Sequence, residues 1–306
     1  YRRVRSVRPA AQRRQLVAER NVVEWLGLLG RGMAMGIAEV VPGVSGGTIA
    51  FVTGIYHELV KTLAGFGIDS VRVLIGRGPV VFWREQNLGF LSVLLIGMVL
   101  SVVAFARVIG YWLDTVPTVV WGFFSGLIVA SVVQIGRERR IGLLLGFGVL
   151  GCAAGIALTS LDPMQLHDSL WVYFIGGLIA ISAWMLPAIS GSFMLLVLGI
   201  YHPLIAALNS WQWPVLSSLA LGCVVGLLVF SKLLAWLMEH RREPVLALLT
   251  GFMAGSVMRL WPWAHEGTLL GPDGYAAATG QDPLVAGTCV AVVAGGASLW
   301  LLSRIK

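Results

Sequence analysis

The segment Gly36-Ile37-Ala38-Glu39-Val40-Val41-Pro42-Gly43-Val44-Ser45-Gly46-Gly47-Thr48 decides the fold, because it interrupts an apolar stretch that is too long for one membrane-crossing helix. That stretch spans residues 22–66, whereas a helix needs only about 20 apolar residues to cross the hydrocarbon core. A proline followed by a Gly/Ser cluster ends one helix and starts another. We therefore expect two shorter helices that enter the membrane and return, with the break at depth.

A second stretch, residues 170–208, is interrupted in the same way by Pro187-Ala188-Ile189-Ser190-Gly191-Ser192. Sliding the sequence by 145 positions aligns the two breaks. Nine residues of the first stretch then recur as identical residues in the second: Ala38, Pro42, Ser45, Gly46, Gly54, Ile55, Tyr56, His57 and Leu59 match Ala183, Pro187, Ser190, Gly191, Gly199, Ile200, Tyr201, His202 and Leu204. The chain therefore contains two copies of one plan.

The composition excludes a water-soluble protein. Of the 306 residues, 57% are hydrophobic and 12% are charged, with a mean hydropathy of +0.83. A soluble domain carries about twice that charged fraction. Six further apolar stretches each fit one crossing: about 88–113, 117–135, 141–159, 214–238, 244–262 and 284–303. We predict an all-α integral membrane protein, with neither a soluble enzyme nor a nucleic-acid partner.

Each copy of the plan consists of a broken, re-entrant hairpin followed by three transmembrane helices. The hairpin crosses the membrane an even number of times, and the three helices that follow make the number of crossings in each copy odd. The second copy therefore starts on the opposite side of the membrane from the first, so the two copies must be inverted repeats. We predict one membrane domain with a first repeat over residues 22–159 and a second over residues 160–306. Residues 1–21 form a basic arm that is expected to lie on anionic headgroups in the cytoplasm.

The positive charges predict the orientation in the membrane. Segments placed inside hold 18 of the 22 Lys and Arg residues, whereas the outer loops near 114–116, 160–169, 209–213 and 263–283 hold none. Cytoplasmic loops carry the excess of Lys and Arg. Both termini are therefore predicted to be cytoplasmic in a multi-pass protein.

The two breaks are the predicted binding site. Glycines let the backbone approach a ligand closely, and hydroxyls beside a helix N-terminus favour an anion. The candidate residues for binding are Gly43, Ser45, Gly46, Gly47 and Thr48 in the first break and Ser190, Gly191 and Ser192 in the second. The alternative is that Gly and Ser only allow tight helix packing. The duplication of the break, with proline in register, favours the site.

Charged residues inside the apolar stretches add further candidates. Glu39 lies three residues before Pro42, at the inner tip of the hairpin, and is predicted either to carry a proton or to form a structural ion pair with Arg31. Arg107 and Arg259 each lie near the outer end of a span, in different halves. They either reach the outer interface or form a clamp for a phosphate that enters from the outer leaflet.

The sequence predicts no metal and no cofactor. The three cysteines, Cys152, Cys223 and Cys289, are an odd number and lie in apolar spans, so neither a disulfide nor a metal site is implied. A phosphate-binding Gly-x-x-x-x-Gly-Lys-Ser/Thr motif is absent from the sequence. If the protein moves a ligand across the membrane, the energy would then come from a gradient, of protons or of sodium, or from removal of the ligand.

The quoted segments, each followed by a Gly-Ile-Tyr run at 54–56 and 199–201, resemble the PopT-type polyprenyl-phosphate transporters. The resemblance covers residues 22–303. It implies that the protein is a flippase and not an enzyme. Its substrate would be undecaprenyl phosphate, a lipid carrier of cell-wall precursors, which would return from the outer to the cytoplasmic leaflet of the bacterial plasma membrane. A homo-oligomer is left open.

Two alternative functions share these residues. A transporter of a small soluble anion or ion would use the same fold and the same breaks but a closed central cavity. An intramembrane serine hydrolase would use Gly43-Val44-Ser45-Gly46 as its nucleophile motif, and it would need a general base paired with Ser45.

Overall fold

The computed structural model describes residues 20–41, 44–161, 164, 169–265 and 267–304. Nearly all of this part is helical, as predicted. The elements up to residue 159 are α2 (Val22–Val40), α3 (Gly46–Val52), α4 (Tyr56–Ala64), α5 (Ile68–Arg77), α6 (Pro79–Glu85), α7 (Leu88–Thr115), α8 (Pro117–Arg137), α9 (Ile141–Leu143), the π-helix η1 (Leu144–Gly148) and α10 (Val149–Thr159).

The second part of the chain repeats this order, except that it has no counterparts of α5 and α6 and contains one insertion. Its elements are α11 (Leu170–Met185), α12 (Gly191–Val197), α13 (Tyr201–Asn209), α14 (Trp213–His240), α15 (Arg242–Ser256), the 3-10 helix η2 (Val257–Leu260), strands β1 (Ala264–His265) and β2 (Thr268–Leu269), α16 (Pro272–Thr279) and α17 (Val285–Arg304). The insertion is the antiparallel pair β1–β2 with α16, which has no counterpart between α8 and α9.

Five helical segments are long and apolar enough to cross a membrane, and they confirm five of the six predicted crossings. These segments are Leu88–Thr115, Pro117–Arg137, Ile141–Thr159, Trp213–His240 and Arg242–Leu260. The sixth predicted crossing is the apolar helix α17, of which Val285–Trp300 falls just short of that length. The protein is therefore a multi-pass membrane protein.

The returning arms of the two hairpins differ from the prediction. Each was expected to be one helix, but each is two short helices, α3 with α4 and α12 with α13. Gly54 and Gly199, 145 positions apart, interrupt them with φ angles of 78° and 73°, a left-handed conformation that glycine adopts without steric cost. The axes of α12 and α13 differ by 108° as a result. The prediction of a single returning helix was wrong, because it overlooked these glycines.

Glycine contacts bring helices close together, and they recur in both parts of the chain. A Cβ added at Gly97 would overlap the carbonyl oxygen of Leu29, which joins α7 to α2. A Cβ added at Gly222 would overlap the carbonyl oxygen of Phe174, so α14 and α11 meet in the same way. Phe174 lies 145 positions after Leu29. Small residues of this kind let helix backbones meet in a membrane. The pairs α2–α7 and α11–α14 therefore have the same packing.

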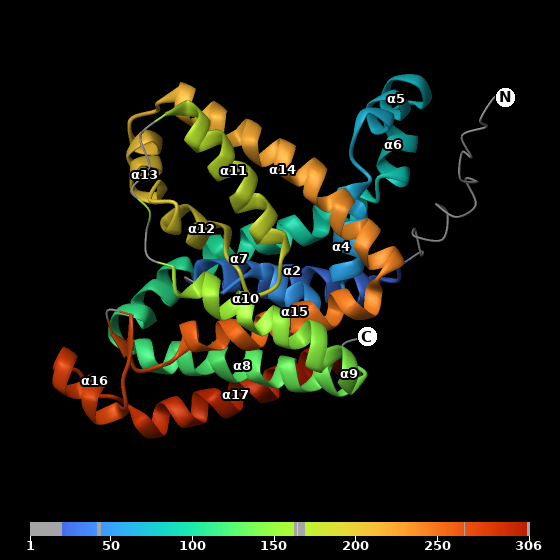
Figure 1. The fold of residues 1–306 in the computed structure, drawn as a ribbon. Coiled ribbons are helices and arrows are strands. Elements are labelled where there is room, and N and C mark those ends of the chain that lie inside the picture. The colour runs from blue at the N-terminus through green and yellow to red at the C-terminus, as the bar shows by residue number, and fades with distance from the viewer. Residues whose placement is uncertain (1–19, 42–43, 162–163, 165–168, 266, 305–306) are drawn as a thin grey trace.

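A second set of pairs crosses between the two parts of the chain. A Cβ added at Gly295 of α17 would overlap the carbonyl oxygen of Phe123 in α8, and one added at Gly151 of α10 would overlap that of Leu248 in α15. Leu248 lies 125 positions after Phe123, the offset that also relates Gly222 to Gly97. Helices α8–α17 and α10–α15 thus tie the two parts into one bundle (Figure 1).

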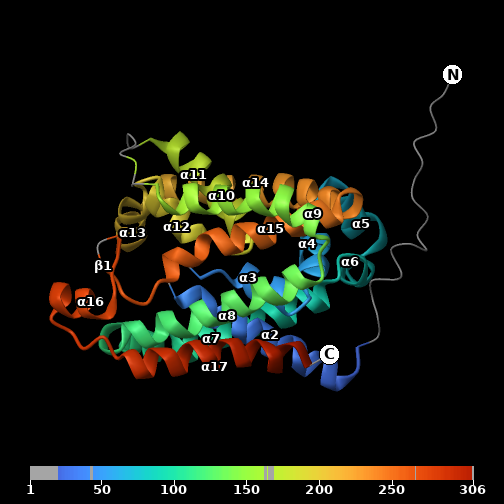
Figure 2. The same ribbon diagram turned by 60° about the horizontal axis from the view of Figure 1, so that its bottom comes forward.

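The bundle has two chemically different ends. Helices α5, α6 and α9 lie at one end in both views, and α13 and α16 lie at the other (Figures 1 and 2). Helices α5 and α6 and the turn at 138–140 before α9 hold five arginines, and we call their side the arginine-rich end: Arg72, Arg77, Arg84, Arg139 and Arg140. The opposite end holds Asp273 in the first turn of α16.

The glycine contacts predict which substitutions the bundle tolerates. Gly222→Ala places a methyl group against the carbonyl of Phe174, and overpacking of this kind costs about 1–3 kcal/mol. We expect the apparent melting temperature of the purified protein to fall by at least about 3 °C. The matched control is Gly110→Ala in α7, where an added Cβ meets no atom within 4 Å. Equal melting of the two variants would contradict the packing described here.

Candidate functional site

The two breaks lie directly against each other. The hydroxyl oxygen of Thr48, two residues into α3, accepts a hydrogen bond of 2.7 Å from the backbone N–H of Ala188 in the second break. The hydroxyl of Tyr56, at the start of α4, donates at 2.8 Å to the carbonyl oxygen of Met185. Both side chains are buried. The first break therefore holds the backbone of the second break by two buried hydrogen bonds.

Glu39 connects both breaks through a single oxygen atom. Its Oε1 accepts one hydrogen bond of 2.7 Å from the backbone N–H of Gly46, at the start of α3. The same oxygen accepts another of 2.8 Å from the indole Nε1–H of Trp184, near the end of α11. The predicted coupling residue thus lies where the two breaks meet, and it fills a place where two N–H groups converge.

The glycines of the first break allow this close approach. A Cβ added at Gly47 would lie 2.9 Å from the carbonyl oxygen of Trp184 and 3.3 Å from that of Leu186. A Cβ added at Gly46 would lie 2.7 Å from Oε1 of Glu39. Position 47 requires glycine, because the backbone oxygen of Trp184 cannot give way, whereas a side chain at position 46 would displace the carboxylate of Glu39. Tight packing therefore explains part of the Gly/Ser cluster, and the polar contacts of the cluster explain the rest.

The serines of the two breaks differ in what they bond. Ser45 caps α3, because its Oγ accepts from the N–H of Gly47 at 3.1 Å, and it is fully buried. Ser190 takes the same position before α12 without capping it, and its Oγ lies 2.7 Å from Oγ of Ser192. The two hydroxyls of the second break thus bond to each other, whereas those of Ser45 and Thr48 in the first break accept from backbone N–H groups.

The hydrolase alternative requires a base beside Ser45. Among the residues that the structure describes, the hydroxyl of Ser45 has one hydrogen-bond partner, the N–H of Gly47, and no hydrogen bond joins it to a histidine or lysine. The serine–base pair is therefore not formed in this conformation. No group of three or more His, Cys, Asp or Glu residues suitable for a metal is found among the residues that the structure describes.

The two predicted arginines have different surroundings. The guanidinium carbon of Arg259, in η2, lies 5.0 Å from the centre of the Phe193 ring, in a cation–π contact. Phe193 follows Ser192 directly, so Arg259 lies beside the second break although its side chain is exposed. Arg107 is exposed on α7, and no described contact joins it to either break. The structure thus brings one of the two arginines to the site.

The remaining predicted residues lie apart from this contact or outside the described chain. Arg31 lies in the middle of α2 and interacts electrostatically with Arg20 and Glu58. Arg20 also forms an ion pair of 2.5 Å with Glu58. Gly43 lies outside the described residues. The partners of Glu39 are Gly46 and Trp184, so the alternative of an ion pair with Arg31 is not formed here.

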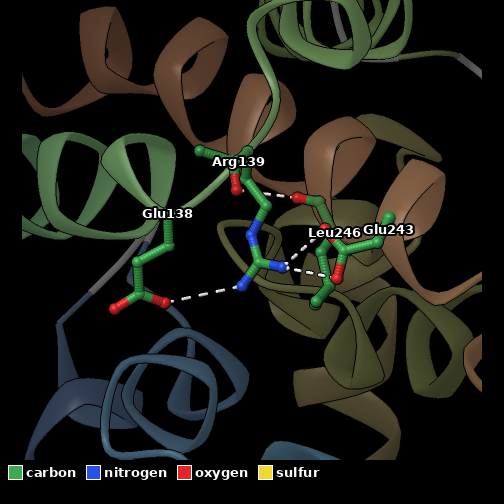
Figure 3. A network of polar contacts seen from close by, with 5 residues as sticks. Glu138, Arg139, Glu243 and Leu246 are labelled. Atoms are coloured by element: carbon green, nitrogen blue, oxygen red, sulfur yellow. Dashed lines mark hydrogen bonds and ion pairs between the residues drawn. The ribbon is translucent and has the colours of Figure 1, made fainter.

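A polar network at the arginine-rich end also joins distant parts of the chain (Figure 3). Arg139, in the turn before α9, donates from Nη1 to both carboxylate oxygens of Glu243 at 2.9 Å, and its Nη2 lies 3.6 Å from Glu138. Glu243 is in the first turn of α15, where a carboxylate also favours the helix dipole. The network fixes the turn between α8 and α9 against α15.

Sequence reasoning missed three members of the site: Tyr56, Trp184 and Ala188. Trp184 is the counterpart of Glu39 at the offset of 145, and this relation is the signal that could have found the contact. Equivalent residues of a two-fold repeat meet when they lie near its axis. Tyr56 belongs to the repeated Gly-Ile-Tyr-His run, but the run itself does not show what its hydroxyl bonds.

Comparison with known proteins identifies the family of the chain. A family model described as undecaprenyl phosphate translocase-like matches residues 35–271, which include both breaks. The chain belongs to this family.

Two relatives share most of the chain. A protein of Vibrio cholerae named polyprenyl-phosphate transporter is 40% identical over 236 residues, which are 76% of this chain and 76% of the relative. A protein of Staphylococcus aureus with the same name is 33% identical over 261 residues, which are 78% of this chain and 87% of the relative. No solved structure matches the chain. The predicted resemblance to polyprenyl-phosphate transporters is thereby confirmed at the level of the family.

The bond between Thr48 and Ala188 can be tested by removing its acceptor. Thr48→Val leaves the Ala188 N–H buried without a partner, which costs about 1–3 kcal/mol. We expect a lower apparent melting temperature for Thr48→Val. Thr48→Ser keeps the hydroxyl and serves as the control. If Val and Ser variants melt together with the wild type, the hydrogen bond does not hold the breaks.

Proposed function

We propose that the protein moves polyprenyl phosphate between the two leaflets of the membrane, with its phosphate passing through the junction of the two breaks. The names of the two relatives support this substrate. The observation that carries the proposal is the carboxyl oxygen of Glu39, which occupies two convergent N–H donors between the breaks. A pair of N–H donors that binds an anionic carboxylate oxygen can also bind an anionic phosphate oxygen.

We further propose that the two halves are inverted repeats. The recurring glycine contacts at offsets of 125 and 145 support this, because the same helix faces meet in both halves. The bond between Glu39 and Trp184 supports it as well, since two repeat-equivalent positions bond to each other only near a pseudo-two-fold axis. In transporters built from inverted repeats, the substrate site lies near the bilayer midplane, where the repeats meet.

The described conformation is closed at this junction. Ser45 and Thr48 are fully buried, and their oxygens are used by Gly47 and Ala188. A lipid phosphate carries about −1.5 to −2 charges and needs several donors when it leaves water. The substrate would therefore take over donors that now bond within the protein, which requires the breaks to move apart. The hydroxyls of Ser190 and Ser192 and the backbone at Gly191 complete the set of groups around it.

Proton uptake by Glu39 offers a way to release the junction. A hydrogen bond to an ionised carboxylate is roughly twice as strong as one to a neutral group. A proton on Glu39 would therefore loosen its hold on Gly46 and Trp184, and the phosphate would compete for them more easily. An inward proton gradient would then favour return of the lipid from the outer to the cytoplasmic leaflet. Sodium remains the alternative coupling ion.

The arginines suggest the direction of the path. With the arginine-rich end in the cytoplasm, as the distribution of Lys and Arg predicts, both termini are cytoplasmic and Arg259 faces the outer side. Arg259 beside Phe193 would then meet the phosphate first and pass it to the second break. Arg107 is retained as a further contact at the outer interface. The recycled lipid is proposed to be undecaprenyl phosphate in a bacterial plasma membrane.

Reconstitution tests the proposed function. The full chain in liposomes should move a fluorescent short-chain polyprenyl phosphate from the outer to the inner leaflet, measured by loss of accessibility to a quencher added outside. Empty liposomes give the background rate. Excess inorganic phosphate should not compete, whereas unlabelled polyprenyl phosphate should. Failure to move the lipid, with or without a pH gradient, would refute the proposal. Competition by inorganic phosphate would favour the soluble-anion transporter instead.

The role of Glu39 is tested in the same liposomes. Wild-type transport should accelerate when the outside is acidified, whereas Glu39→Gln should move the lipid at a rate that no longer responds to the gradient. Glu85→Gln is the control, because Glu85 lies on α6, away from the junction, and pairs with Arg77 of α5. A Glu39→Gln variant with the full wild-type response to pH would show that the proton is carried elsewhere.

A further inference from the structure

A groove of about 430 Å³ opens on the side of the bundle between α8, η1 with α10, and α15. Its lining is almost entirely apolar and includes Val133, Val149, Cys152 and Ala254. Thr250 also lines it, but its hydroxyl donates to the carbonyl of Leu246 within its own helix. The groove therefore offers a hydrocarbon surface, with one charged residue, Arg137, at its end.

The local backbone explains why the groove is present. Residues 144–148 form a π-helix, whose wider turn departs from the regular helix before and after it. Such turns are rare and often mark functional sites. Gly136, on the facing helix α8, leaves the opposite wall open, since an added Cβ would meet only Thr250 Cγ2 at 4.0 Å. Helices α10 and α15 meet closely at Gly151 and Gly255, which closes the floor.

Arg137 differs from the arginines that follow it. Arg139 is held by Glu243 and Glu138, as described above (Figure 3). Arg137 is the last residue of α8 and is exposed, and the described part of the chain provides it with no acidic partner. Because Arg139 fixes the turn, Arg137 stays at the end of an apolar groove with its charge available. An apolar groove with an unpaired guanidinium at its end is complementary to a lipid that has an apolar tail and an anionic headgroup.

We propose that this groove binds the isoprenoid tail of a polyprenyl phosphate, with the phosphate on Arg137. The proposal rests on the function proposed above and adds a second lipid position, separate from the junction of the breaks. In the predicted orientation this position lies in the cytoplasmic leaflet, where the returned lipid leaves the protein. A volume of about 430 Å³ holds part of one chain, and the remainder stays in the bilayer.

Photo-crosslinking tests the position directly. The full chain is reconstituted in phosphatidylethanolamine–phosphatidylglycerol liposomes with a short-chain polyprenyl phosphate that carries a diazirine in its tail. Mass spectrometry should place the label on groove residues such as Val133, Val149 and Cys152. Arg137→Gln should reduce this labelling about tenfold, the scale of one charge-assisted hydrogen bond. Arg140→Gln removes the same charge three residues away, outside the groove lining, and should change labelling less than about threefold.

A second variant tests the groove without changing its charge. Gly136→Leu should fill the space and reduce labelling while leaving Arg137 in place, and Gly136→Ala should have little effect. Labelling is normalised to folded protein, measured by gel filtration. The proposal is overturned if label spreads over other lipid-facing helices, if Arg137→Gln and Arg140→Gln behave alike, or if prenyl alcohol or phosphatidylglycerol competes as well as polyprenyl phosphate.

The outcomes also separate this inference from the proposed function. If wild-type protein moves the lipid in liposomes but the label avoids the groove, the groove proposal fails and the function stands. If the groove is labelled with the expected dependence on Arg137 but no lipid changes leaflet, the groove remains a lipid-binding site and the proposed function fails.

Discussion

The structure depends on satisfying polar backbone at a place that water is not expected to reach. Two helices are interrupted inside the membrane bundle, and each interruption exposes N–H groups that cost several kcal/mol if left unpaired in lipid. The protein meets this constraint by pairing one break with the other. Glu39 accepts from Gly46 and Trp184, and Thr48 accepts from Ala188. These bonds act together with the helix pairs α8–α17 and α10–α15, which also join the two halves.

This mutual pairing has a consequence for transport. The same groups that would hold a phosphate are occupied by the protein in the described conformation, so substrate and protein compete for them. A junction of this kind is stable when empty and does not leave an open polar path across the membrane. In the proposed mechanism it would open only when a ligand or a proton offers comparable bonds, which would link the movement of the breaks to the presence of substrate.

The two halves are alike in packing but different in chemistry. At the position related by 145 residues, one half carries the acceptor Glu39 and the other carries the donor Trp184, so their difference creates the bond. Ser45 caps its helix, whereas Ser190 bonds to Ser192 instead. The groove beside Arg137 likewise depends on the π-helix η1, which the helix α17 of the other half does not have. The contact between the two breaks thus depends on differences between the halves as well as on their likeness.

The sequence by itself determined the class of protein, five of the crossings, the two breaks and their relation by a repeat, because these depend on local hydrophobicity, proline and glycine. It missed the bends at Gly54 and Gly199, although each glycine was visible. Only the tertiary structure decided that Glu39 bonds to Trp184 rather than Arg31, and that Arg259 but not Arg107 lies beside a break. Those outcomes depend on which helix faces meet, and contacts between residues so far apart in the sequence leave no local pattern in the chain.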